Sequence, residues 1–119
     1  LWCGDFFHLR REDLQGVSLV YDRAALIALP PAMRVDYARH LKTLLPDAVA
    51  ILLVTLDYPE GEISGPPFNV SDAEVQALYG DDFDVVRLFH RALPHDDDFA
   101  RRRGLGKASE SVFRITRRP

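Results

Sequence analysis

Apolar and polar positions along this chain form segments that predict strands separated by helices. Residues 17–21 and 48–56 are compact apolar runs without helical spacing, and each predicts a buried strand. The second run is almost continuously apolar, which is the pattern of a central parallel strand covered on both faces. Residues 84–90 and 111–117 carry interspersed polar side chains and predict two strands near a sheet edge, paired antiparallel.

A helix is predicted between the two buried strands. Pro30 or Pro31 lies in its first turn, where a missing N–H costs no hydrogen bond, and Pro46 ends it. Apolar residues at three- and four-residue steps predict its core face: Met33, Tyr37, Leu41, Leu44 and Leu45. The polar residues between them predict a solvated face: Arg34, Asp36, Arg39, His40 and Lys42.

A second helix is predicted before the last two strands. Ser71 with Glu74 three residues later has the signature of a capping box, and Gly80 ends the helix. The apolar residues of this segment predict its core face: Val75, Leu78 and Tyr79. Strands that alternate with helices indicate an α/β sheet.

The start of the chain predicts the tail of a further strand. Residues 1–7 have this pattern, and residues 11–15 predict at most one helical turn before Gly16. The chain begins within an apolar segment and without methionine, so we expect residues 1–119 to be one partial domain, the later part of a longer protein. Half of a nucleotide-binding sheet would then lie upstream.

Composition narrows the function classes. The net charge of −3 and the pI of about 5.7 argue against a broad nucleic-acid-binding face. A basic run near the end follows three aspartates that largely cancel its charge. Cys3 is the only cysteine, which excludes an internal disulfide and makes a reducing, cytoplasmic compartment the default expectation. No apolar run is long enough to cross a bilayer, and no signal peptide is recognised.

Several common sites have no counterpart in the sequence. The four histidines are scattered without Cys or His partners at ligand spacing, so no metal site is expected. There is no nucleophile elbow and no P-loop motif. A glycine-rich cofactor loop is also missing, but such a loop follows the first strand of its fold, so its absence here is uninformative.

Three segments are candidates for function. Residues 3–7 (Cys-Gly-Asp-Phe-Phe) join a carboxylate to aromatic rings that could flank a purine; the alternative is a turn capped by Asp5 with core phenylalanines. Asp22 and Arg23 follow a strand, where ligands of open α/β sheets bind; the alternative is a surface ion pair between them. Residues 65–68 (Gly-Pro-Pro-Phe) predict a rigid loop that walls a crevice or only connects elements.

In order along the chain, these blocks resemble the thiopurine S-methyltransferase family, particularly its bacterial members. The residues that carry the resemblance are Trp-Cys-Gly-Asp-Phe-Phe at 2–7, Tyr-Asp-Arg-Ala-Ala-Leu-Ile-Ala-Leu-Pro-Pro at 21–31, Leu-Asp-Tyr at 56–58, Gly-Pro-Pro-Phe at 65–68 and Ser-Glu-Ser-Val-Phe-Arg at 109–114. The resemblance implies a Rossmann-like sheet that uses S-adenosylmethionine. This chain would hold the end of strand three and strands four to seven, the last antiparallel.

The resemblance also implies roles for individual residues. Asp5 and Phe6 match positions that meet the adenine of the cofactor, and Arg23 matches an arginine beside cofactor and substrate. Pro67 and Phe68 match a loop near the substrate. A second arginine near the acceptor is matched by Arg101, with Arg102 and Arg103 as competitors because the loop length is uncertain.

The function implied is methyl transfer to the sulfur of thiopurines or small thiols, or to selenium or tellurium compounds, with no nucleic acid or membrane partner. The fragment alone would be inactive, because the cofactor loop would lie upstream. Two alternatives remain. One is a non-catalytic α/β binding or assembly module derived from the same scaffold, and the other is a methyltransferase for another acceptor, such as a halide or a carboxylate.

Overall fold

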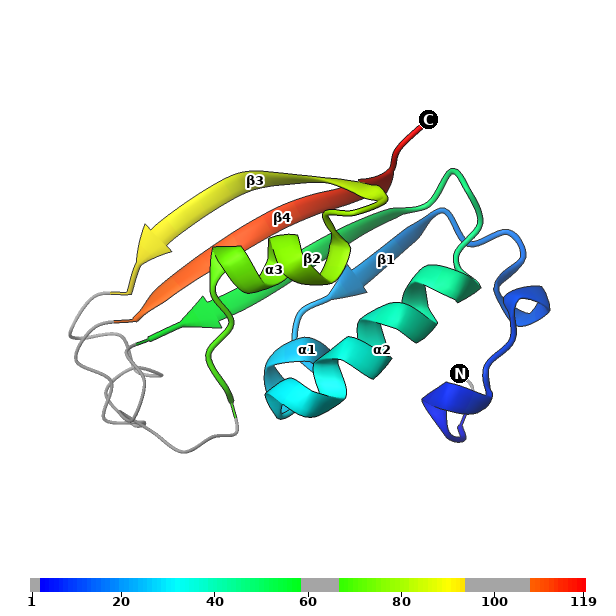
Figure 1. Cartoon of the computed structure of the whole chain (residues 1–119), viewed down its shortest axis with the longest axis horizontal. Helices are drawn as coiled ribbons and strands as arrows, with labels where there is room; N and C mark the ends of the chain where they lie inside the picture. Colours follow the sequence, from blue (N-terminus) through cyan, green and yellow to red (C-terminus); the bar gives the residue numbers. More distant parts are fainter. Residues whose placement is uncertain (1–2, 59–66, 94–107) are drawn as a thin grey trace.

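The computed structural model describes residues 3–58, 67–93 and 108–119. Within them lies a four-stranded sheet with the order β1-β2-β4-β3 (Figure 1). The strands are β1 (Leu19–Asp22), β2 (Ala50–Asp57), β3 (Phe83–Ala92) and β4 (Ser109–Arg117). β1 pairs parallel with β2, and β4 is antiparallel to both β2 and β3. The expected α/β sheet with an antiparallel pair at the end of the chain is therefore confirmed.

Three α-helices lie together on one face of the sheet (Figure 1). They are α1 (Ala25–Ala28), α2 (Pro31–Leu44) and α3 (Asp72–Tyr79). The main core lies between this layer and the sheet, and its fully buried side chains include Leu26, Ile51, Leu53, Val75, Tyr79 and Ile115. Burial of these apolar surfaces is the main stabilising contribution of the layer.

No helix of the described residues covers the opposite face of the sheet. Along β2, Ile51 and Leu53 are fully buried, whereas Leu52 and Val54 are only partly covered. The strand is central, as predicted, but the expectation that both its faces are covered is correct for one face only. Helices α1, α2 and α3 all lie on the face to which Ile51 and Leu53 point.

Helix α2 begins at the predicted prolines, with Pro30 as N-cap and Pro31 as its first residue. Its buried face differs from the prediction: Met33 is 46% exposed, while Arg34 is only 1% exposed. Arg34 lies at one end of a buried row that continues through Ala38 and Leu41. The prediction that Arg34 is solvated was wrong because its guanidinium finds buried partners, described below.

Helix α3 is capped as predicted by Ser71, whose Oγ accepts a hydrogen bond from the Glu74 N–H at 3.1 Å. The Glu74 carboxylate, however, binds Arg34 of α2. Val75 and Tyr79 are fully buried, as expected for the core face of this helix. The N–H of Gly80 closes the last turn on the carbonyl of Gln76.

The predicted strand tail at the start of the chain is not formed in the described residues. Phe6–His8 forms a short 3-10 helix, η1, and Arg11–Leu14 forms a second one, η2. Asp5 is the N-cap of η1. A strand must share its backbone hydrogen bonds with a neighbour, and β1 has only β2 beside it among the described residues. The single helical turn expected at 11–15 is confirmed, and Gly16 follows it with φ of 85°, a conformation that favours glycine.

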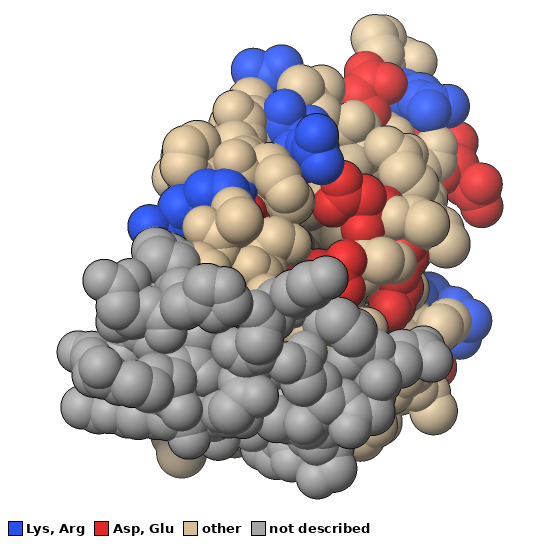
Figure 2. Space-filling model, turned by 90° about the vertical axis from the view of Figure 1, so that its left-hand side faces the viewer, with Lys and Arg blue, Asp and Glu red and all other residues tan. Residues whose placement is uncertain are grey.

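Figure 2 views the molecule from the end at which β1 and β2 terminate. Basic and acidic side chains are interspersed over the described part of this face, and neither charge covers it alone. In the ranges that the structure describes, no helix is both long and apolar enough to span a bilayer.

Candidate functional site

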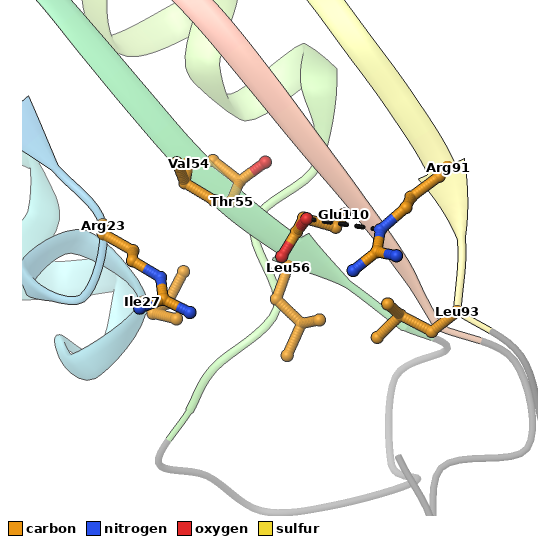
Figure 3. Close-up of a pocket in the computed structure, with 8 residues that line it drawn as sticks. All are labelled: Arg23, Ile27, Val54, Thr55, Leu56, Arg91, Leu93 and Glu110. Carbon is orange, nitrogen blue, oxygen red and sulfur yellow. Dashed lines mark ion pairs between the residues drawn. The ribbon is translucent and has the colours of Figure 1, made fainter. Parts of the chain in front are cut away.

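A hollow of about 250 Å³ lies where β1, β2 and β3 end and β4 begins. Figure 3 shows its lining residues: Arg23, Ile27, Val54, Thr55, Leu56, Arg91, Leu93 and Glu110. Ile27 and Leu93 also pack on a small apolar cluster of Leu56, Tyr58 and Ala108, separate from the main core. The hollow therefore combines an apolar floor with charged side chains on opposite sides.

Arg23 supplies the charge on one side of this hollow. It follows the last residue of β1, and its side chain lines the hollow. Its neighbour Asp22 is 3% exposed and lies on the buried face of the sheet. Successive side chains of a strand point to opposite faces, which separates the two groups. Asp22 is buried and bonded to Tyr37, whereas Arg23 is exposed, so the alternative of a surface pair between them is wrong.

Asp22 instead binds a tyrosine of α2. The hydroxyl of Tyr37 donates to Asp22 Oδ2 at 2.7 Å. Burial raises the pKa of Asp22, and the hydrogen bond from Tyr37 offsets part of that rise. Burial, together with the charge of Asp22, raises the pKa of Tyr37, so this hydroxyl remains a donor. Asp22 Oδ1 is buried, and the nearby backbone N–H groups of Leu26 and Ala25 also lower the pKa of this carboxyl.

The segment around Asp5 and Phe6 lines a second hollow of about 260 Å³ with four of its neighbours: Cys3, Gly4, His8 and Leu9. Asp5 Oδ1 accepts a hydrogen bond from the Phe7 N–H at 2.9 Å, which is the capping role given as the alternative. Phe6 packs on Tyr37, with ring centroids 5.1 Å apart. Tyr37 thus connects Phe6 to Asp22, the residue before Arg23. The contact of Asp5 and Phe6 with adenine stays a prediction.

The end of the predicted substrate loop is held beside the first hollow. The Phe68 N–H donates to the carbonyl of Ile27 at 2.6 Å, and the hydroxyl of Tyr58 donates to the carbonyl of Pro67 at 2.7 Å. Neither Pro67 nor Phe68 is among the described lining residues of that hollow, although Ile27 is. Gly65 and Pro66 lie outside the described residues, as do the three candidate arginines Arg101, Arg102 and Arg103.

Sequence reasoning missed the charged pair opposite Arg23. Arg91 Nε lies 3.5 Å from Glu110 Oε1, and the two residues are directly opposite each other on β3 and β4. The antiparallel pairing of these strands was predicted, but their register was not. Arg91 and Glu110 lie 19 positions apart in the sequence (110 − 91 = 19), so no local spacing indicates the contact.

The described residues contain no group of three His, Cys, Asp or Glu side chains that could hold a metal ion. The polar groups that meet at the first hollow are two guanidinium groups and one carboxylate, with a threonine hydroxyl beside them. Such a set can bind a small anionic or polar molecule whose body is apolar.

Comparison with known proteins identifies the family. The family model for thiopurine S-methyltransferase (TPMT) matches residues 1–118. The chain is similar to the thiopurine S-methyltransferase of Marinobacter nauticus (52% identical, covering 99% of this chain and 54% of the relative). It is also similar to the enzyme of the same name from Nitrosospira multiformis (48% identical, with coverage of 99% and 54%). The chain therefore spans about half the length of these curated relatives.

Comparison with solved structures identifies the fold. The crystal structure of a SAM-dependent methyltransferase from Anabaena variabilis matches with a TM-score of 0.63 at 14% identity, covering 91% of this chain and 53% of that one. The sheet is thus the C-terminal part of a methyltransferase fold with its last strand antiparallel, as the resemblance implied. With the family model matched over 118 residues, this chain belongs to the thiopurine S-methyltransferase family.

Proposed function

We propose that the protein containing this chain transfers a methyl group from S-adenosylmethionine to the sulfur of a thiopurine or another small thiol, with selenium or tellurium compounds as possible acceptors. The observation that carries the proposal is Arg23, a guanidinium on the wall of an apolar-floored hollow at the end of β1 in a chain of this family. Residues 1–119 would form the C-terminal part of the methyltransferase domain.

The described residues fit one part of the cofactor. Asp5 and Phe6 line a hollow that offers an aromatic ring and a carboxylate, of which Oδ1 is engaged by the Phe7 N–H. A planar purine with an exocyclic amine matches these groups, because the ring can stack on Phe6 and the amine can donate to the carboxylate of Asp5. Asp5, Phe6 and Arg23 are the residues of this chain that would hold the group. When bound, S-adenosylmethionine supplies an electrophilic methyl group.

Arg23 would orient the acceptor and stabilise its anionic form. A thiol reacts as the thiolate, and the thiolate population rises beside a cation. Arginine has a pKa above about 12 and cannot serve as the base, so the proton of the thiol leaves to solvent or another group. We assign the same electrostatic role to Arg101, with Arg102 and Arg103 as the other candidates.

The walls of the hollow would exclude water and fix the direction of approach. Ile27, Leu56 and Leu93 offer apolar contacts to a flat acceptor. Pro67 and Phe68, tied to Tyr58 and Ile27, would close one side of the acceptor site. Positioning of the two sulfur centres in line can supply on the order of 7–11 kcal/mol of the barrier, so little acid–base machinery is needed.

The proposal is tested on the complete gene product with an assay of methyl transfer to thiophenol and 6-mercaptopurine. Arg23→Ala is expected to lower kcat/KM strongly while the melting temperature stays near that of the parent protein. Arg23→Lys should restore only part of the activity, because the lysine ammonium lacks the planar fork of the guanidinium. Near-normal turnover of Arg23→Ala at saturating cofactor would remove Arg23 from the mechanism.

The same proposal has consequences for partners and location. We expect small-molecule acceptors, a cytoplasmic location and no nucleic-acid or membrane partner. The 119 residues alone are expected to be inactive, because they hold only part of the cofactor site. If the complete gene product neither binds S-adenosylhomocysteine in calorimetry nor methylates any thiol, the scaffold serves as a binding or assembly module.

A further inference from the structure

We propose that Glu110, paired with Arg91, selects acceptors by the charge at the end of the molecule remote from the sulfur, disfavouring those that carry a carboxylate there. The inference rests on the proposed function, since it takes the hollow at Arg23 as the acceptor site. It assigns the pair a specificity role and leaves the chemical step unchanged.

The geometry places the pair across the hollow from Arg23. In Figure 3, Arg23 approaches from the end of β1, whereas Arg91 and Glu110 project from β3 and β4 on the other side, with Leu56 between the two groups. An acceptor whose sulfur lies at Arg23 would therefore extend over Leu56 and present its far substituent to Arg91 and Glu110.

The charges of the hollow determine how that substituent is received. Arg91 Nε and Glu110 Oε1 are 3.5 Å apart, and their side chains are 50% and 29% exposed. Glu110 largely neutralises Arg91, so this wall offers little net positive charge to an acceptor. A carboxylate on the far end of the acceptor would meet repulsion from Glu110 and could bind Arg91 only by displacing it. A neutral substituent would be unaffected.

The pair is suited to tuning specificity because it is only partly buried. A fully buried pair would lose stability when one partner is removed, which would obscure any effect on the acceptor. A half-exposed pair of this kind contributes little to folding, so its main effect is on charges that approach it. Glu110 and Arg91 are therefore positioning and selecting groups, distinct from the group assigned to the sulfur.

The test uses the complete gene product and two matched acceptors, thiophenol and 4-mercaptobenzoate, with kcat and KM measured for each. Glu110→Gln is expected to lower KM for 4-mercaptobenzoate about three- to tenfold, with kcat and the KM for thiophenol nearly unchanged. Calorimetry with the methylated products, thioanisole and 4-(methylthio)benzoate, should give the same shift in Kd without turnover. Adding Arg91→Met to Glu110→Gln should abolish the gain.

The control is Asp84→Asn, which removes an acid that pairs with Arg118 at 3.1 Å and does not line the hollow. This variant should leave the ratio of the two KM values unchanged. An unchanged ratio in Glu110→Gln, or equal changes for both acceptors, would overturn the inference while leaving the proposed function intact. If the parent protein methylates neither thiol, the proposed function is contradicted instead. If the Kd of each methylated product is the same in the parent protein and in Glu110→Gln, the inference is overturned without any measurement of turnover.

Discussion

Arg34 Nη1 donates hydrogen bonds to both carboxylate oxygens of Glu74, at 2.8 and 2.7 Å, and joins helix α2 to helix α3. Arg34 Nε donates to the carbonyl of Leu29 at 3.0 Å, which fixes the connection between α1 and α2. The side chain of Arg34 is 1% exposed and that of Glu74 is 30% exposed. One cation therefore links α2 to α3 and to the residue that ends α1.

Breaking this pair should destabilise the fold asymmetrically. Glu74→Gln leaves a buried guanidinium without its counter-charge and is expected to lower the free energy of unfolding by about 2–3 kcal/mol, below the full range for buried pairs because Glu74 is partly solvated. Arg34→Met replaces the cation by an apolar chain and leaves Glu74 near solvent, so its loss should be smaller, about 1 kcal/mol. Urea denaturation of the complete gene product measures both.

Asp72→Asn is the matched control for the α2–α3 pair. Asp72 lies in the same helix and binds Arg87 at 2.6 Å, but both side chains are about half exposed (47% and 48%). We expect a loss below about 0.5 kcal/mol. If Glu74→Gln were as mild as Asp72→Asn, the buried pair would not hold the two helices together.

The bond between Tyr37 and Asp22 predicts a pH-dependent stability. Burial holds the pKa of Asp22 above its ordinary value of 3.8, so stability is lost as pH rises from that value through the folded-state pKa. The hydroxyl of Tyr37 stabilises the charged carboxylate and limits this loss. Tyr37→Phe should therefore cost about 1–3 kcal/mol at pH 7 and less at pH 4.

Thermal melts of the parent protein and Tyr37→Phe across this pH range check the prediction. Tyr21→Phe serves as the control, because Tyr21 is 62% exposed on β1, whereas the hydroxyl bonded to Asp22 is that of Tyr37. A difference between parent and Tyr37→Phe that stays constant with pH would show that the bond does not act through the charge of Asp22.

The elements with a clear apolar pattern were predictable, and the polar exceptions were not. The apolar run at 48–56 and the capping serine at 71 both reappear in β2 and α3. The helical periodicity predicts a solvated Arg34, because it treats every cation as exposed. Its burial depends on Glu74, which lies 40 positions away in the sequence. Because the Glu74 carboxylate binds Arg34, it does not complete the capping box that its spacing predicts.

In the candidate site, too, the residue with a local sequence signal was predictable and the contact between residues far apart in the sequence was not. Arg23 could be placed at the ligand-binding edge of the sheet because the carboxyl ends of parallel strands meet there, and it does line a hollow. Arg91 and Glu110 could not be found from spacing, since their contact depends on the register of β3 against β4. This register contains an irregularity between Arg87 and Phe89, which shifts the faces of the residues that follow.

Tyr58 should hold the end of the proposed substrate loop without entering the chemistry. Its side chain is 6% exposed, and its hydroxyl binds the carbonyl of Pro67. Tyr58→Phe is expected to raise KM for the thiol about two- to fivefold with little change in kcat, because only the placement of the loop is lost. Steady-state kinetics with thiophenol measures the change.

Thr43→Val is the control for Tyr58→Phe. It removes a comparable bond to a carbonyl at the far end of α2 and should leave KM unchanged. Equal effects of both variants would contradict the role of Tyr58.

The exposed apolar side chains and the free edge of β1 predict self-association of the 119-residue chain. Leu19 and Tyr21 of β1 are 58% and 62% exposed, and among the described residues β1 has β2 alone as a neighbour. An unpaired strand edge beside exposed apolar side chains favours association. Light scattering should show oligomers or aggregates that Leu19→Lys with Tyr21→Lys reduces, because lysine opposes edge pairing. Met33→Lys with Val35→Lys removes similar apolar surface from α2 (46% and 47% exposed) and should have less effect; a monomeric parent chain with cooperative melting would refute the prediction.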